Sequence, residues 1–151
     1  MASEEMKPQL HTLLQDYLTE LSQYDEIDTD YPYFDDYWQD ETRWPYLILA
    51  GDRIAGFALI NQHSPSGLGT DYAVAEFYIL PLFRKTGAGS TAFKELLKKH
   101  KGTWEISIMA DNQPAQNFWP KTITQVNIQN LKQILQDDET IYRFNTEDKT
   151  Q

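Results

Sequence analysis

Residues 77–90 read Phe77-Tyr78-Ile79-Leu80-Pro81-Leu82-Phe83-Arg84-Lys85-Thr86-Gly87-Ala88-Gly89-Ser90. This stretch predicts a buried strand, a short turn and a helix that begins at the glycines. The first turn of a helix carries backbone N–H groups without internal partners and the positive end of the helix dipole. Because glycine has no Cβ, a phosphate group can approach this backbone closely. The stretch therefore predicts a site for a phosphate-bearing ligand.

The composition limits what else the chain can do. Its 151 residues suffice for one ordinary domain with a substantial core, and we predict a single domain over residues 1–151. The chain contains no cysteine, which excludes disulfides, thiol nucleophiles and thiolate metal sites. We expect no metal cofactor.

Charge and hydropathy limit the kinds of partner that the chain can bind. The formal net charge of −10 argues against nucleic acid, whose phosphates would be repelled. No apolar run approaches the roughly 20 residues that span a bilayer. The start Met1-Ala2-Ser3-Glu4-Glu5 is acidic where a signal peptide would be basic. We therefore expect a cytoplasmic protein that binds neither nucleic acid nor a membrane.

The spacing of apolar residues predicts helices and strands along the whole chain. We expect helices over residues 8–24, 35–41, 87–99 and 114–119, the last ended by Pro120. We expect strands over residues 46–50, 53–60, 72–80, 103–109, 123–128 and 140–144. Gly51 and Asp52 would join the first two strands as a hairpin. This order predicts a mixed α/β sheet.

Three interpretations of the glycines compete at this point. The run Gly87-Ala88-Gly89-Ser90-Thr91-Ala92 formally matches a dinucleotide-binding fingerprint. However, the four residues from Pro81 to Arg84 separate it from the strand, and the rest of the chain is too short for the remaining parallel strands. A Walker P-loop fails because no Gly-Lys-Ser/Thr follows the glycines. An ordinary surface loop with solvated charges stays open.

Two motifs in a fixed order favour another interpretation. The first is Arg84-Lys85-Thr86-Gly87-Ala88-Gly89 after a strand, and the second, after the next strand, is Asn112-Gln113-Pro114-Ala115-Gln116-Asn117-Phe118-Trp119. They resemble the Arg/Gln-x-x-Gly-x-Gly/Ala and Asn-x-x-Ala-x-x-Phe-Tyr signatures of the GNAT family of acyl-CoA-dependent N-acyltransferases. The resemblance covers roughly residues 47–144. It implies a single GNAT-like domain with a mostly antiparallel central sheet, flanking helices and a splayed parallel pair of strands.

The resemblance also implies a co-substrate, acetyl-CoA, and the residues that bind it. The pantetheine would lie between the splayed strands, bonded by the backbone of Ile79 and Leu80. Asn112 would lie along the CoA arm, with Phe118 packed beside it. The pyrophosphate would be held by the first motif and the helix start, that is by Arg84, Lys85, Thr86, Gly87, Ala88, Gly89 and Ser90. The family resemblance permits a homodimer.

The implied reaction is direct attack of an amine on the thioester within a ternary complex, which needs no covalent intermediate and agrees with the missing cysteine. Glu76 is the only acid in its strand and is our candidate for the base. A strand-edge or ion-paired glutamate is an equal alternative. Trp119 stands where the family often has a tyrosine that protonates the leaving thiolate, which an indole cannot do. Tyr142 or a water is then the candidate acid.

Residues 24–38 form an acidic aromatic segment ahead of the sheet, which the resemblance places beside the acceptor site. Carboxylates and aromatic faces both attract ammonium groups. We therefore expect a cationic small-molecule or peptide amine as acceptor, bound by Tyr31, Tyr33, Asp35 and Asp36. Alternatively, the aromatic rings fill the core and the acids keep the surface soluble. Two other classes of function stay open, a non-catalytic acyl-CoA sensor and an interaction module for a basic partner.

Overall fold

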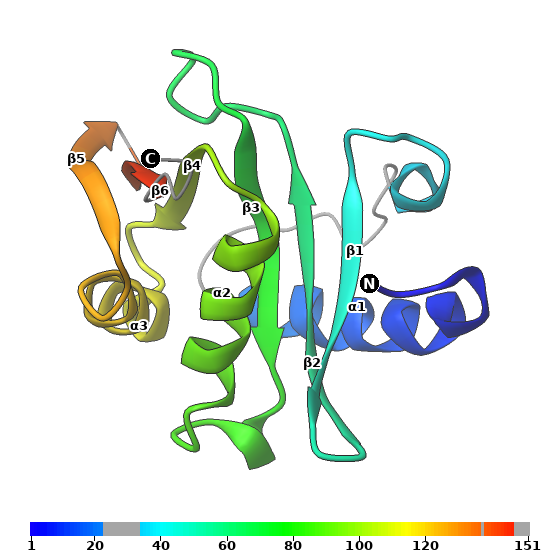
Figure 1. The fold of residues 1–151 in the computed structure, drawn as a ribbon. Coiled ribbons are helices and arrows are strands. Elements are labelled where there is room, and N and C mark those ends of the chain that lie inside the picture. The colour runs from blue at the N-terminus through cyan, green and yellow to red at the C-terminus, as the bar shows by residue number, and fades with distance from the viewer. Residues whose placement is uncertain (23–33, 137, 147–151) are drawn as a thin grey trace. The chain divides into compact units, whose positions relative to one another are not determined.

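The computed structural model describes residues 1–22, 34–136 and 138–146. Its strands form a six-stranded mixed sheet in the order β1-β2-β3-β4-β6-β5 (Figure 1). The chain divides into two compact units. Unit 1 is Met1–Asn61 with Ala75–Gly89, and unit 2 is Gln62–Val74 with Ser90–Gln151. The predicted mixed α/β class is confirmed.

Unit 1 contains the opening helix and the hairpin. Its elements are η1 (Glu4–Met6), α1 (Lys7–Leu21), η2 (Asp35–Trp38), β1 (Trp44–Ala50), β2 (Arg53–Asn61), the end of β3 (Tyr72–Ile79) and η3 (Pro81–Phe83). The strands β1 and β2 pair antiparallel, and Gly51 makes their turn at a φ of +64°. The predicted hairpin is therefore confirmed.

The leucine stripe of α1 covers the hairpin. Leu10, Leu14 and Leu18 are buried in one cluster with Phe57 of β2 and Tyr78 of β3. Figure 1 shows α1 crossing behind β1 and β2. Each large side chain in such a core stabilises the fold by about 1.5 to 3 kcal/mol. The amphipathic pattern of the opening helix is thus explained by its cover over the sheet.

The backbones of β2 and β3 approach closely at one glycine. A Cβ placed on Gly56 would lie 1.9 Å from the carbonyl oxygen of Tyr78. Any side chain there would have to push the two strands apart. The glycine therefore permits the spacing that brings the end of β3 into the core of unit 1.

Unit 2 is built around aromatic rings. Its elements are the start of β3, α2 (Ala88–Lys99, begun in unit 1), β4 (Thr103–Met109), α3 (Gln113–Ile123), β5 (Ile128–Gln136) and β6 (Glu139–Thr146). The Phe93 ring of α2 lies edge-on to Trp104, Trp119 and Phe144, with centroids 6.1, 5.1 and 6.3 Å away. These rings anchor α2 and α3 to β4 and β6.

The parallel pair is β3 and β4. Tyr72, Ala73 and Val74 are opposite Trp104, Glu105 and Ile106. Both β4 and β5 pair antiparallel with β6. The parallel pairing ends at Val74, the last β3 residue of unit 2. The splay of the two strands beyond this point stays a prediction.

A buried carboxylate fixes the loop between β2 and β3. Glu105 is fully buried, forms an ion pair with Arg143, and accepts hydrogen bonds from Ser64 Oγ (3.0 Å), the Ser66 N–H (3.0 Å) and Ser66 Oγ (2.8 Å). Burial would raise the pKa of Glu105, but these hydrogen bonds outweigh it and hold the pKa below its ordinary value. The loop is therefore tied to β4 and β6 by a charged group.

Two predicted elements after β4 are wrong. The helix does not end at Pro120 but continues to Ile123, because Trp119, Thr122 and Ile123 are buried and outweigh the missing N–H of one proline. A strand over residues 123–128 is likewise wrong, and the strand that forms is β5. Most of β5 is exposed on both faces, so its sequence carries no alternation that would reveal it.

Among the described residues, none of the helices combines the length and apolar composition that crossing a membrane requires.

Candidate acyl-CoA site

The glycine loop, residues 84–90, leads from the end of β3 into α2. Lys85 and Gly87 have left-handed φ angles of +64° and +88°, which turn the chain into the helix. Nothing lies within 4 Å of the position that a Gly87 Cβ would occupy. The Thr86 hydroxyl donates to Phe83 O at 2.5 Å and accepts from the Ala88 N–H at 3.4 Å. The backbone at the start of α2 is thus open on the side of Gly87.

Arg84 holds this loop to α1 within unit 1. Its Nε donates to Ile79 O at 2.8 Å, and its Nη2 lies 3.0 and 2.9 Å from the two carboxylate oxygens of Glu20. The guanidinium also lies 5.5 Å from the Tyr78 ring centroid. Arg84 therefore has protein partners at the end of β3. Its contact with acyl-CoA stays a prediction.

The backbone groups at the end of β3 also have partners. The Leu80 N–H donates to Ala55 O at 2.7 Å, and Ile79 O accepts from Arg84. The Leu80 N–H would have to exchange its bond to donate to pantetheine, whereas Ile79 O has a second lone pair. The assignment of Ile79 and Leu80 to the acyl-CoA arm stays a prediction.

Glu76, the candidate base, is half-buried on β3. The Tyr17 hydroxyl of α1 forms a side-chain hydrogen bond with it. Burial first, and then the negative charge of Glu76, raise the pKa of Tyr17 well above its ordinary value. Tyr17 therefore stays protonated at neutral pH and donates to the Glu76 carboxylate.

Sequence reasoning missed the roles of Tyr17 and Glu20. Tyr17 is the one hydroxyl in an otherwise leucine stripe, and buried tyrosine hydroxyls usually have a partner, so this signal was readable. Glu20 gives no such signal, because its pairing with Arg84 depends on how α1 packs across unit 1. Together, Tyr17 and Glu20 connect α1 to Glu76 and to the glycine loop.

The second motif lies in unit 2, and its residues have structural contacts there. Asn112 caps α3, since its Oδ1 accepts from the Ala115 N–H at 3.2 Å. Trp119 is buried against Phe93, and the half-buried Phe118 lies edge-on to Trp119 at 4.9 Å. Contacts of Asn112 and Phe118 with CoA stay predictions.

The two candidate catalytic residues belong to different units. Tyr142 is buried on β6, opposite Ile106 of β4, in unit 2. Glu76 lies in unit 1. Their pairing as acid and base stays a prediction.

The predicted acceptor residues are described only in part. Tyr31 and Tyr33 lie outside the described residues. Asp35 is exposed and forms an ion pair with the Lys7 ammonium at 2.7 Å, and Asp36 is half-buried. The Lys7 ammonium also lies 5.9 Å from the Phe34 ring centroid and 5.3 Å from that of Trp38.

The described part of the acidic aromatic segment also serves the core. Phe34 and Tyr37 are buried, and the Trp38 Nε1–H lies 3.2 Å from both Ala2 O and Ser3 O. The aromatic rings of residues 34–38 therefore anchor the N-terminus of unit 1. The Asp35 carboxylate and the rings of Phe34 and Trp38 already hold one ammonium group, that of Lys7.

Within residues 1–22, 34–136 and 138–146, no group of three or more histidine or acidic side chains is arranged to hold a metal ion.

The glycine loop between β3 and α2 and the parallel pair β3-β4 are features of a known family. The model of the Acetyltransferase (GNAT) family matches residues 8–123, more than half of the chain. The chain belongs to the GNAT family. This membership confirms the family resemblance that the two motifs indicate. The protein is therefore an acyl-CoA-dependent acyltransferase.

Solved structures share the GNAT fold at low identity. An acetyltransferase from Thermus thermophilus is 14% identical with a TM-score of 0.66, over 94% of this chain and 92% of that one. RimL, a ribosomal L7/L12 α-N-protein acetyltransferase in complex with coenzyme A, is 15% identical with a TM-score of 0.63, over 96% and 91%. An acetyltransferase from Bacillus subtilis in complex with CoA is 14% identical with a TM-score of 0.51, over 97% and 93%. No curated protein matches this chain.

Proposed function

We propose that this GNAT protein is an N-acetyltransferase that moves an acetyl group from acetyl-CoA to a primary amine of a small cationic molecule. The observation that carries the proposal is the geometry of the glycine loop. Gly87 turns the chain at a φ of +88°, has open space where a Cβ would be, and is followed at once by α2. The N–H groups in the first turn of a helix have no acceptor within the helix and suit a pyrophosphate.

The chemistry needs a base, because an attacking amine must be neutral and then lose a proton. In the proposed reaction the amine nitrogen attacks the thioester carbonyl, a C–N bond forms, and the C–S bond breaks. Glu76 takes the proton directly or through one water, while the hydrogen bond from Tyr17 fixes the orientation of its carboxylate. The thiolate leaves and is protonated by Tyr142 or by water, since a thiol with a pKa near 8.5 needs little help.

The acceptor class rests on charge. Asp35, Phe34 and Trp38 surround the Lys7 ammonium, so groups of this segment do hold a cation. The chain has a net charge of −10, which attracts polycations. We therefore propose that Tyr31, Tyr33, Asp35 and Asp36 favour acceptors with several amino groups.

The test is thiol release from acetyl-CoA in the presence of an amine panel. The panel compares polyamines, aminoglycosides and lysine-rich peptides with monoamines that carry no further charge. We expect release with the polycationic amines. Release only with monoamines would end the acceptor proposal but keep the acetyltransferase proposal. Absence of release with every amine would contradict acetyl transfer.

A matched pair of variants tests the loop. Gly87→Asp adds a carboxylate to the glycine loop, and Gly67→Asp adds one at a similar left-handed glycine (φ +80°) that is also free of neighbours within 4 Å. Both substitutions add one negative charge. Both also place an aspartate at a left-handed φ, so the two variants have a similar free-energy cost in the backbone. We expect Gly87→Asp alone to raise KM for acetyl-CoA by about tenfold or more, since it repels the pyrophosphate.

A second candidate is an acyl-CoA sensor without turnover. It is favoured by Trp119, which is buried against Phe93 and offers no hydroxyl for a leaving thiolate. A sensor would be stabilised thermally by acetyl-CoA through mass action, yet would release no thiol with any amine. The two measurements together separate the candidates.

A further inference from the structure

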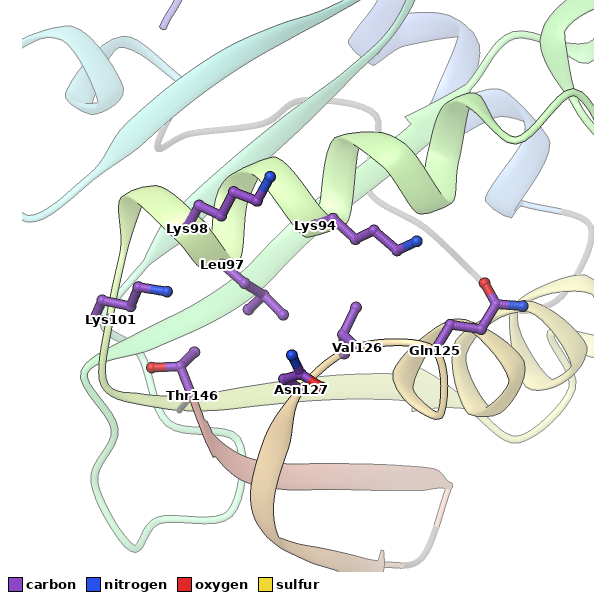
Figure 2. A pocket seen from close by; sticks show the side chains of 8 residues that line it. All are labelled: Lys94, Leu97, Lys98, Lys101, Gln125, Val126, Asn127 and Thr146. Atoms are coloured by element: carbon purple, nitrogen blue, oxygen red, sulfur yellow. The ribbon is translucent and has the colours of Figure 1, made fainter. Parts of the chain in front are cut away.

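Unit 2 contains a pocket at the other end of α2 from the glycine loop. It has a volume of about 260 Å³ and is shown in Figure 2. Its lining residues are Lys94, Leu97, Lys98, Lys101, Gln125, Val126, Asn127 and Thr146. They come from the C-terminal half of α2, the turn after it, the segment between α3 and β5, and the end of β6. All of these elements belong to unit 2.

The pocket is basic in a chain that is strongly acidic overall. Three lysines line it, whereas the whole chain has a net charge of −10. Lys98 has a loose, exposed ion pair with Glu95 at 3.5 Å. Within the described part of the chain, no carboxylate lies within 4.0 Å of the ammonium of Lys94 or Lys101. These two charges are therefore available to a ligand.

The walls of the pocket are held by hydrogen bonds. The Gly102 N–H donates to Thr146 Oγ1 at 2.8 Å, and the Thr146 N–H donates to Gly102 O at 2.9 Å, which fixes the end of β6 beside Lys101. The Gln125 N–H donates to Thr122 O at 3.1 Å, which fixes the turn after α3. Leu97 is buried and lines the pocket. The lysines thus project from a backbone that is already ordered.

The lining combines three kinds of contact. Figure 2 shows Lys101 and Lys94 on opposite sides of the pocket, with Leu97 and Val126 between them and the amides of Asn127 and Gln125 at its edge. Ammonium groups bind phosphate oxygens as point charges. Leucine and valine suit an apolar surface, and the amides add hydrogen-bonding groups. A volume of about 260 Å³ is near the lower end of small-molecule sites.

We propose that this pocket binds a small organic phosphate monoester. The dianionic phosphate lies against Lys101, and the organic part extends over Leu97 and Val126 toward Lys94. This site is separate from the glycine loop. The loop leads into the first residue of α2, whereas only the C-terminal half of α2 lines the pocket. The proposal does not depend on acetyl transfer, so its failure and the failure of the proposed function are distinguishable.

The test uses binding rather than activity. The protein is labelled at leucine and valine methyl groups, and NMR shifts of Leu97 and Val126 are followed during titration with glucose 6-phosphate, glycerol 3-phosphate and AMP. Inorganic phosphate and citrate serve as anions without a phosphate ester. CoA is left out, because its own ribose 3′-phosphate is a phosphate monoester that would compete with the probes. We expect saturable shifts at both methyl groups with at least one monoester.

Charge-removing variants locate the site. Lys101→Gln should weaken the best monoester about tenfold, because it removes a charge-assisted contact, and Lys94→Gln should weaken it less, because it removes a more distant charge. Lys132→Gln removes the same charge from the exposed strand β5 and should leave the affinity unchanged. Gly87→Asp should also leave it unchanged, since the glycine loop takes no part.

Three results would overturn the proposal. The first is absence of methyl shifts with every monoester. The second is equal binding of citrate or inorganic phosphate. The third is an affinity of the Lys101→Gln variant equal to that of the unchanged protein.

Discussion

Arg84, at the start of the glycine loop, is paired with Glu20 of α1, and its Nη2 lies 3.0 and 2.9 Å from the two carboxylate oxygens. The same guanidinium donates through Nε to Ile79 O at 2.8 Å. One side chain therefore connects the end of β3, the glycine loop and α1. Arg84 positions the loop through these contacts.

Glu20→Gln removes the charge that holds Arg84. The Arg84 side chain is 39% exposed and the Glu20 side chain is 33% exposed. Because solvent screens such a pair, we expect a loss of folding stability below about 1 kcal/mol. The larger effect should be a rise in KM for acetyl-CoA of about threefold to tenfold with a smaller change in kcat. Steady-state kinetics measure this split. Glu95→Gln, which removes an exposed ion pair on α2, is the control, and an equal KM in both variants would contradict the positioning role.

Tyr17→Phe removes the hydroxyl that donates to Glu76 and keeps the ring in the core. The high pKa of Tyr17 means that this residue does not itself titrate in an assay between pH 5 and 9. Without its donor, the Glu76 carboxylate loses a hydrogen bond that favours its charged form. We expect a lower kcat and a shift of the acidic limb of the kcat/KM profile to higher pH.

The companion variant for this prediction is Glu76→Gln, which should abolish most of kcat if Glu76 is the base. In a Glu76→Gln background, Tyr17→Phe should have little further effect, because the two residues act together. Additive losses in the double variant, with an unshifted pH profile in Tyr17→Phe, would show that Tyr17 only fills the core.

Glu105 makes folding stability depend on pH. Its pKa is lower in the folded state, where hydrogen bonds from Ser66 and Ser64 and the ion pair with Arg143 outweigh burial. The stabilisation is therefore complete above the ordinary glutamate pKa of about 4.3 and is lost as the pH falls through the lower folded value. Glu105→Gln should reduce stability by about 3 kcal/mol at pH 7 and flatten its pH dependence below about pH 5. Urea unfolding across this pH range measures both effects, and an unchanged slope would disprove the role of the carboxylate.

Gly56→Ala tests the close approach of β2 and β3. The new Cβ would lie 1.9 Å from Tyr78 O, so the strands must move apart, and we expect destabilisation of about 2 kcal/mol or more. Gly51→Ala is the comparison, because it meets no neighbour within 4 Å and costs only its left-handed φ of +64°, about 1 kcal/mol. Thermal denaturation of the two variants should rank Gly56→Ala as the less stable. The reverse order would contradict the steric argument.

The sequence predicted those elements whose pattern is strong and local. The strand over residues 103–109 is confirmed at both ends as β4, and the helix over residues 87–99 differs from α2 by one residue. Trp104, Ile106 and Ile108 are buried, so their alternation carries the signal. By contrast, β5 lies at the edge of the sheet, mostly exposed, with a register shift between Gln129 and Lys132 that breaks the alternation. Its pairing with β6 stabilises it, which local pattern does not reveal.

By itself, the sequence determined the class of fold and the family, because two motifs and the order of helices and strands are properties of neighbouring residues. Only the tertiary structure decided which side chains meet. Arg84 forms an ion pair with Glu20, and Lys7 forms one with Asp35. Tyr17 forms a hydrogen bond with Glu76. Each contact joins residues that are far apart in the sequence. Such contacts depend on how α1 packs against β3 and η2, since electrostatic and hydrogen-bond energies act over distances in space and not along the sequence.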